Sequence, residues 1–220
     1  MRCVFLIFSM VFGVALPQSG ALLAQSAAAT TRPVAREMNL PRTRWENQPG
    51  SERWTRSTLA ALESHGAALP MSVPEDISAW CPAYPEAEPG QRRAFWVGFL
   101  SALSKYESTY KPTAVGGGGR WFGLVQIQPS TARGYGCYAR SGAELKNGSA
   151  NLSCAVRIMA VTVPRDGVIA TKDGSWKGVA ADWGPVRSAS KRSEMQSWLS
   201  QQTYCRPLAS VRPRPRPERR

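Results

Sequence analysis

Histidine is almost absent from this chain of 220 residues, and the only one is His65. The sequence also contains no Cys-x-x-Cys pair, so the residue types and spacings that bind zinc are missing. The glycine-rich stretch VGGGGRWFG, residues 115–123, lacks the terminal Gly-Lys-Ser/Thr of a phosphate-binding loop, and no nucleotide-type strand precedes it. We therefore expect no metal and no cofactor, and we interpret the glycine-rich stretch as flexible backbone near a site.

Acidic residues are scarce, with 15 Asp and Glu against 28 Lys and Arg, and the formal net charge is +13. Much of the excess lies in residues 206–220, where alternating arginine and proline predict a disordered, extended tail. Such a tail could bind an anionic envelope polymer or a membrane surface, or it could serve solubility alone. Nucleic acid is the least favoured partner, because a nucleic-acid-binding protein would carry its positive charge on the folded domain rather than in a tail.

The first 26 residues have the pattern of a secretory signal peptide: Arg2, an uncharged apolar stretch, and then small residues. Pro17 interrupts the apolar stretch before it reaches the length that spans a membrane. We expect an exported protein, periplasmic or secreted, that is a monomer. Residues 27–50 are interpreted as a linker, 51–75 as an N-terminal helical extension, and 76–205 as the main domain.

Export affects how the cysteines are interpreted, because Cys3 leaves with the signal peptide and four cysteines remain. An even number in an exported domain favours disulfides. Four cysteines allow three pairings, and the sequence cannot choose among them. We favour one pair that closes a short loop and one that joins the two ends of the domain, namely Cys137–Cys154 and Cys81–Cys205.

Five segments carry apolar residues at helical spacing, which predicts a mainly α domain. They are residues 51–66, 91–110, 149–163, 173–185 and 188–202. Ser51 is the expected N-cap of the first segment, and Pro164 is expected to end the third. In the fourth segment the side chains expected to face inward are Trp176, Val179, Ala180 and Trp183.

The stretch SALSKYESTYKP, residues 101–112, places a carboxylate on an apolar stripe. Trp96, Leu100 and Leu103 follow one another at helical spacing, and the next step is Glu107. Burial on that stripe and the negative end of the helix dipole both raise a carboxyl pKa. A carboxyl that stays protonated near neutral pH can act as a general acid, whereas pairing with Lys105 or Lys111 would make Glu107 a structural residue.

The residues from Glu107 onward resemble two motifs of the soluble lytic transglycosylase (SLT) family, whose members are lysozyme-fold enzymes that cleave peptidoglycan. The family pattern is E-S followed by proline and alanine, then G-L-M-Q-[IL], then a proline that opens a T-A helix. The matching positions are Glu107, Ser108, Pro112, Ala114, Gly123, Leu124, Gln126, Ile127, Pro129, Thr131 and Ala132. Val125 replaces the methionine, and Asn151-Leu152 resembles the pair that opens the next helix. The resemblance covers roughly residues 92–186 and implies a goose-type lysozyme/transglycosylase fold.

The resemblance implies a role for each matched side chain. Glu107 would be the single acid and base, and Gln126 would hydrogen-bond the sugar near the scissile bond. Ser108 and Asn151 are further candidates for substrate binding, although Ser108 could instead support the helix end. Tyr110 and Trp121 could form walls for sugar rings or simply pack in the core. Peptidoglycan glycan strands would be the substrate, cut between N-acetylmuramic acid and N-acetylglucosamine to leave a 1,6-anhydro muramic acid end.

Two departures from the family pattern leave alternatives open. Gly116 stands where the family usually has a serine, and the A-Y-N-x-G motif appears only as AADWG, residues 180–184, so that Ala181 replaces the tyrosine. A hydrolase of the goose-type lysozyme class would need a second acid on the water side of the sugar. The candidates for that acid are Asp166, Asp173 and Asp182. A non-catalytic peptidoglycan-binding module of the same fold is the third alternative.

Overall fold

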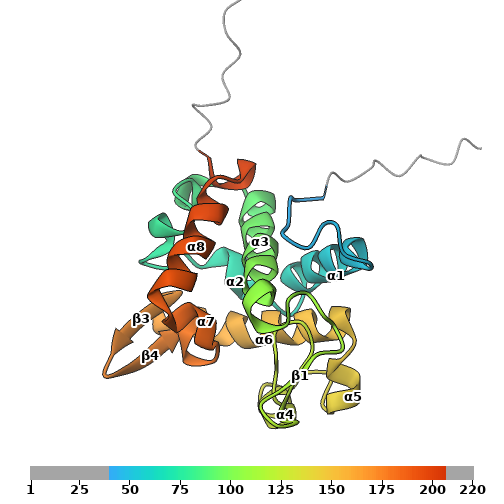
Figure 1. Cartoon of the computed structure of the whole chain (residues 1–220). Helices are drawn as coiled ribbons and strands as arrows, with labels where there is room; N and C mark the ends of the chain where they lie inside the picture. The colour runs from blue at the N-terminus through green and yellow to red at the C-terminus, as the bar shows by residue number, and fades with distance from the viewer. Residues whose placement is uncertain (1–39, 207–220) are drawn as a thin grey trace, which may run out of the picture. The chain divides into compact units, whose positions relative to one another are not determined.

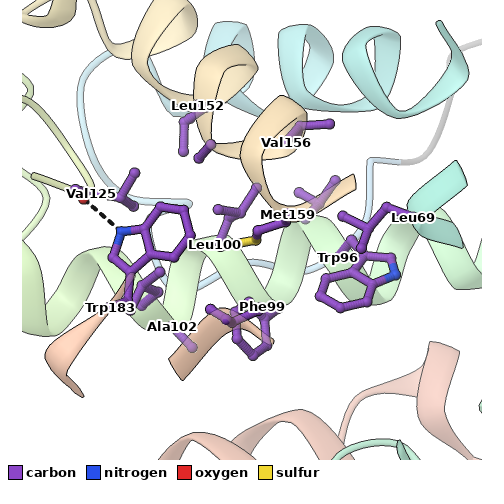
Figure 2. Close-up of a cluster of buried hydrophobic side chains, with 14 of the residues drawn as sticks. Leu69, Trp96, Phe99, Leu100, Ala102, Val125, Leu152, Val156, Met159 and Trp183 are labelled. Atoms are coloured by element: carbon purple, nitrogen blue, oxygen red, sulfur yellow. Dashed lines mark hydrogen bonds between the residues drawn. The ribbon is translucent and has the colours of Figure 1, made fainter. Parts of the chain in front are cut away.

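Two 19-residue helices, α3 (Pro89–Glu107) and α6 (Gly148–Asp166), form the centre of the fold in the computed structural model, which describes residues 40–206. Figure 2 shows side chains of both helices meeting in one apolar cluster. The cluster includes the fully buried residues Trp96, Phe99, Leu100, Leu152, Val156 and Met159. The domain is mainly helical and lysozyme-like, as the sequence predicts.

The remaining elements surround these two helices (Figure 1). The other helices are α1 (Ser51–Glu63), α2 (Ala68–Met71), α4 (Pro129–Gly134), α5 (Gly142–Leu145), α7 (Gly184–Arg187) and α8 (Ala189–Ser200). Single turns of 3-10 helix are η1 (Ile77–Ala79), η2 (Tyr84–Glu86), η3 (Val179–Ala181) and η4 (Thr203–Cys205). Two antiparallel hairpins complete the described part: β1 (Val115–Gly116) pairs with β2 (Trp121–Phe122), and β3 (Ala170–Asp173) with β4 (Ser175–Gly178).

Helix α3 is buried on all sides over most of its length. It begins with a capping box, in which Glu88 and Gln91 satisfy each other's backbone N–H groups, and with Pro89 in its first turn. Every residue from Phe95 to Ser104 is buried. The predicted apolar stripe is therefore right but incomplete, because the middle of this central helix, between its first and last turns, presents no solvent face.

Several predicted boundaries are wrong in detail. The 91–110 helix ends at Glu107, and α6 runs past Pro164 to a left-handed Gly167 with φ 69°. The helix predicted over 173–185 is instead the β3–β4 hairpin followed by η3. The hairpin turns at Gly174, whose φ is 65°, a left-handed conformation that glycine adopts without a steric cost. Val179, Ala180 and Trp183 are nevertheless buried, as expected, while Trp176 is only partly buried.

The segment that precedes α1 belongs to the folded domain. Trp45 is fully buried, and its indole N–H donates a hydrogen bond to Thr55, 3.0 Å away. Residues 40–50, expected to be part of a linker, thus pack against the helix expected to be an extension, and α1 itself packs on α6. The N-cap of α1 is Gly50 rather than Ser51. The predicted signal peptide, residues 27–39 and the tail beyond residue 206 lie outside the described residues.

Both disulfides form with the favoured pairing. Cys81 bonds Cys205 across a sequence separation of 124, and Cys137 bonds Cys154 across a separation of 17. The first links the chain after η1 to η4, which follows α8. The second attaches the chain after α4 to α6. Within residues 40–206 no helix has the length and apolar character to cross a membrane, and no cluster of potential metal ligands is found.

Candidate active site

Glu107 is the last residue of α3 and is half-buried. No hydrogen bond or ion pair engages its carboxylate among residues 40–206, and Lys105 pairs with Glu194 instead. Burial raises the pKa of Glu107 to about 7, against a smaller lowering by the charge of Lys191. A structural ion pair is therefore not what places this acid on the helix.

The chain turns sharply directly after the acid. Thr109 and Tyr110 have φ values of 51° and 61°, which are uncommon for residues other than glycine. The Ser108 hydroxyl donates to the carbonyl oxygen of Leu124, 2.8 Å away. This bond attaches the end of α3 to the loop that follows β2. Ser108 is buried and its hydroxyl is used in this bond, which agrees with the predicted support of the helix end; its contact with substrate stays a prediction.

Asn151 on α6 holds the same loop from the other side. Its carboxamide oxygen accepts from the N–H of Val125 and its amide donates to the carbonyl of Phe122, both at 2.9 Å. The indole N–H of Trp183 donates to the carbonyl of Val125 at 2.8 Å (Figure 2). Asn151 is fully buried and its polar atoms are used inside the protein. Asn151 therefore supports the loop, and its contact with substrate stays a prediction.

Gln126 belongs to this supported loop and is partly buried. It adopts a left-handed conformation with φ 49°, and strain of this kind persists only where surrounding contacts impose it. Its amide donates to the carbonyl oxygen of Gly123 at 2.9 Å. Gln126 lines a pocket of about 50 Å³ together with Trp121 and Asp182. The structure therefore brings two of the predicted substrate-binding residues, Gln126 and Trp121, to one pocket.

The aromatic candidates differ in exposure. The Trp121 side chain is 39% exposed, and the Arg120 guanidinium lies over it, 5.0 Å from the ring centroid. It therefore offers surface to a sugar ring. Tyr110 is partly buried against the core, and burial raises the pKa of its hydroxyl. It is a packing residue with one accessible edge.

Gly116 is explained by the conformation of Gln126. A Cβ atom at residue 116 would lie 2.3 Å from the carboxamide oxygen of Gln126, closer than two such atoms can approach. The glutamine side chain thus occupies the space that a serine would need at this position. Because the near atom is the end of a flexible side chain, a residue with a Cβ at position 116 would require the Gln126 carboxamide to shift.

If the chain cleaves peptidoglycan, as the sequence resemblance implies, Gly116→Ser is expected to lower that cleavage by about tenfold, because the new side chain displaces Gln126 from its pocket. Loss of turbidity of purified sacculi measures the effect. Gly134→Ser is the matched control, since a Cβ there meets no atom within 4 Å. Activity of the Gly116 variant at or above that of the wild type would show that Gln126 is not held in this way.

The three candidate second acids are not equivalent. Asp166 accepts from the Arg165 guanidinium at 2.7 and 2.8 Å and from the N–H of Gly178, and Asp173 pairs with Lys177 at 2.9 Å. Asp182 makes no side-chain hydrogen bond or ion pair among the described residues, and desolvation raises its pKa even though the side chain reaches solvent. It alone faces the Gln126 pocket.

The sequence analysis missed a charged cluster behind the acid. Glu194 on α8 accepts from the Arg44 guanidinium, from the Tyr106 hydroxyl at 2.7 Å and from Lys105 at 3.2 Å. These hydrogen bonds, above all from Arg44, lower the pKa of Glu194 to about 2. Nothing local in the sequence signals the cluster, because Arg44 lies in the presumed linker and Glu194 belongs to an ordinary polar helix face.

Fold and site together define a lysozyme-like domain with one acid of raised pKa at the end of a buried helix. The family description "Transglycosylase SLT domain" matches residues 85–167, and the chain belongs to this family. Among solved structures, the chain is similar to wild-type Bd0314 DslA, with 30% identity and a TM-score of 0.70, covering 77% of this chain and all of that one. Two DslA variants, each with one glutamate replaced by glutamine, give TM-scores of 0.71 and 0.69 at 30% and 29% identity. No curated protein matches the chain.

Proposed function

We propose that the protein is a peptidoglycan lytic transglycosylase that cuts between N-acetylmuramic acid and N-acetylglucosamine. The observation that carries this proposal is Glu107, whose pKa of about 7 leaves it protonated over a useful range near neutrality. Membership of the SLT family supports the peptidoglycan substrate. Because that substrate lies outside the cytoplasm, we propose a periplasmic or secreted location.

Cleavage begins with proton transfer from Glu107 to the bridging oxygen. The bond from the muramic acid anomeric carbon to that oxygen breaks, and N-acetylglucosamine leaves with a free hydroxyl. Positive charge develops on the muramic acid ring, where the substrate's own acetamido group can stabilise it. Gln126 and Trp121, which line one small pocket beside the supported loop, supply an amide and a partly exposed indole that can contact the sugar.

The second half of the reaction needs no water. Glu107, now ionised, takes the proton of the muramic acid 6-hydroxyl while that oxygen bonds to the anomeric carbon. The 1,6-anhydro ring closes and Glu107 returns to its protonated form, so the proton balance is complete. Intramolecular attack has a large advantage in effective concentration. One acid suffices for both halves.

Hydrolysis is the second candidate, and Asp182 favours it. A hydrolase needs a base on the water side of the sugar, and Asp182 is the unpaired carboxylate among the three candidates. Its raised pKa weakens the case, since a base must be ionised to accept a proton.

Mass spectrometry of the products separates these reactions. Digested wall fragments with anhydro muramic acid ends, one water lighter than hydrolysed ends, are expected from the wild-type protein. Full-mass reducing ends that diminish in Asp182→Asn would instead establish hydrolysis. Sacculi that bind the protein but release no fragments would leave a glycan-binding module as the function.

A further inference from the structure

A lysine of α8 lies beside the proposed acid without an ionic partner. Helix α8 packs along α3 (Figure 1), and its Lys191 ammonium lies over the ring of Tyr106, 5.4 Å from the centroid. Tyr106 immediately precedes Glu107, and the charge of Lys191 acts on the Glu107 carboxyl, whose pKa it lowers against the larger effect of burial, so the ammonium lies near the end of α3. Lys191 is exposed and makes no hydrogen bond or ion pair among residues 40–206.

The carboxylate of Glu194, which could neutralise Lys191, is already occupied. Both of its oxygens accept from Arg44, one also from the Tyr106 hydroxyl and the other from Lys105. Lys105 lies over the same tyrosine ring at 5.3 Å, yet unlike Lys191 it has Glu194 as a partner. Arg44 and Lys105 therefore pair with Glu194 while Lys191 stays unpaired, so these three cations and one ionised carboxylate leave a net positive charge near the acid.

We propose that Lys191 binds a carboxylate of the substrate next to the scissile bond. This inference rests on the proposed function, which supplies the anion: muramic acid carries a lactyl group, which is a free carboxylate when the stem peptide is removed, and the stem peptide itself ends in carboxylates. An ammonium is a flexible point charge suited to either source. Lys191 would thus bind on the muramic acid side of the linkage and make the protein prefer peptidoglycan to an uncharged amino-sugar polymer.

Binding measurements on inactive protein test the proposal without relying on turnover. Glu107→Gln and Glu107→Gln/Lys191→Ala are titrated with glycan strands that carry stem peptides and with strands stripped by an amidase. Each preparation is compared with the same strands after their carboxylates have been converted to methylamides. Lys191→Ala is expected to weaken binding of the charged strands about fivefold and to leave the neutralised strands unchanged.

The two sources of the carboxylate give different patterns. A loss confined to stem-bearing strands identifies the peptide, and a loss on stripped strands identifies the lactyl group. Lys191→Arg, which keeps the charge, is expected to bind within about twofold of the parent. Lys172→Ala is the matched control, since Lys172 is also an exposed lysine over an aromatic ring, Trp176, but on the β3–β4 hairpin.

Equal weakening on charged and neutralised strands, or none on either, overturns the proposal. Its failure is distinguishable from failure of the proposed function. Carboxylate-dependent binding through Lys191 by a protein that releases no wall fragments would leave this inference standing and refute catalysis. Anhydro products from a protein whose binding does not depend on Lys191 would refute this inference and support the proposed catalysis.

Discussion

Glu107→Gln is expected to lower the rate of wall cleavage by at least about 100-fold. Glutamine has nearly the same shape as a protonated glutamate but cannot give up or accept the proton. Since Glu107 is proposed to act in both halves of the reaction, no other described residue replaces it. The initial rate of turbidity loss of sacculi, together with the yield of anhydro fragments, measures the effect.

The pH dependence of the wild type should agree with this role. With a pKa of about 7, the protonated fraction of Glu107 falls as pH rises through neutrality, so cleavage should decline above pH 7. Glu52→Gln is the control, because Glu52 is an exposed glutamate of α1 paired only with Arg56. Undiminished cleavage by the Glu107 variant would remove the enzyme hypothesis altogether.

The free energy of unfolding of Glu107→Gln, compared with that of the wild type, tells loss of chemistry from loss of the folded state. The folded-state pKa of Glu107 is raised from 4.5 to about 7, so its contribution to stability is fully present below pH 4.5 and is lost as pH rises through 7. Glutamine stays neutral. The variant should therefore be more stable than the wild type at pH 8, by at most about 3 kcal/mol because the side chain is partly exposed.

Replacement of Cys81 and Cys205 by alanine is expected to lower the free energy of unfolding by about 5 kcal/mol. The bond closes a loop with a sequence separation of 124, so its loss frees most of the domain in the unfolded chain. Alanine is chosen because both cysteines are buried and serine would bury a hydroxyl. Urea unfolding followed by tryptophan fluorescence gives the difference.

The second disulfide supplies the comparison. Removal of Cys137–Cys154, with a separation of 17, should cost about 3 kcal/mol, less than removal of Cys81–Cys205. A larger loss for the short loop would mean that local packing against α6, rather than chain entropy, sets the contribution of these bonds.

Most of the helical framework could be predicted from the sequence because its signals are local. Apolar spacing located α1, α3, α6 and α8, and Pro129 correctly marked the start of α4. The same reasoning failed at residues 173–185, where two tryptophans and short apolar runs fit a helix and a hairpin equally well. Pairing of β3 with β4 is a contact between separate residues, which periodicity along the chain does not reveal.

For the predicted site residues, the structure shows which side chains are accessible, a point that the motifs leave open. Gln126 and Trp121 line one pocket, and Glu107 is half-buried. Asn151 and Ser108 belong to the same motifs but act inside the protein, since both are buried and bonded to the loop at residues 122–125. A motif identifies conserved chemistry of a family and does not distinguish a ligand contact from a support.

By itself, the sequence determined the acid, its place at the end of an apolar helix and the family to which the chain belongs. The tertiary structure alone decided that Lys105 is held by Glu194, that Lys191 approaches the acid and that Gln126 fills the space beside Gly116. The physical reason is the separation along the chain of the residues that interact. Helix formation and capping depend on residues a few positions apart, whereas charge, burial and free space at the site are set by α8 and the segment before α1, far from Glu107 along the chain.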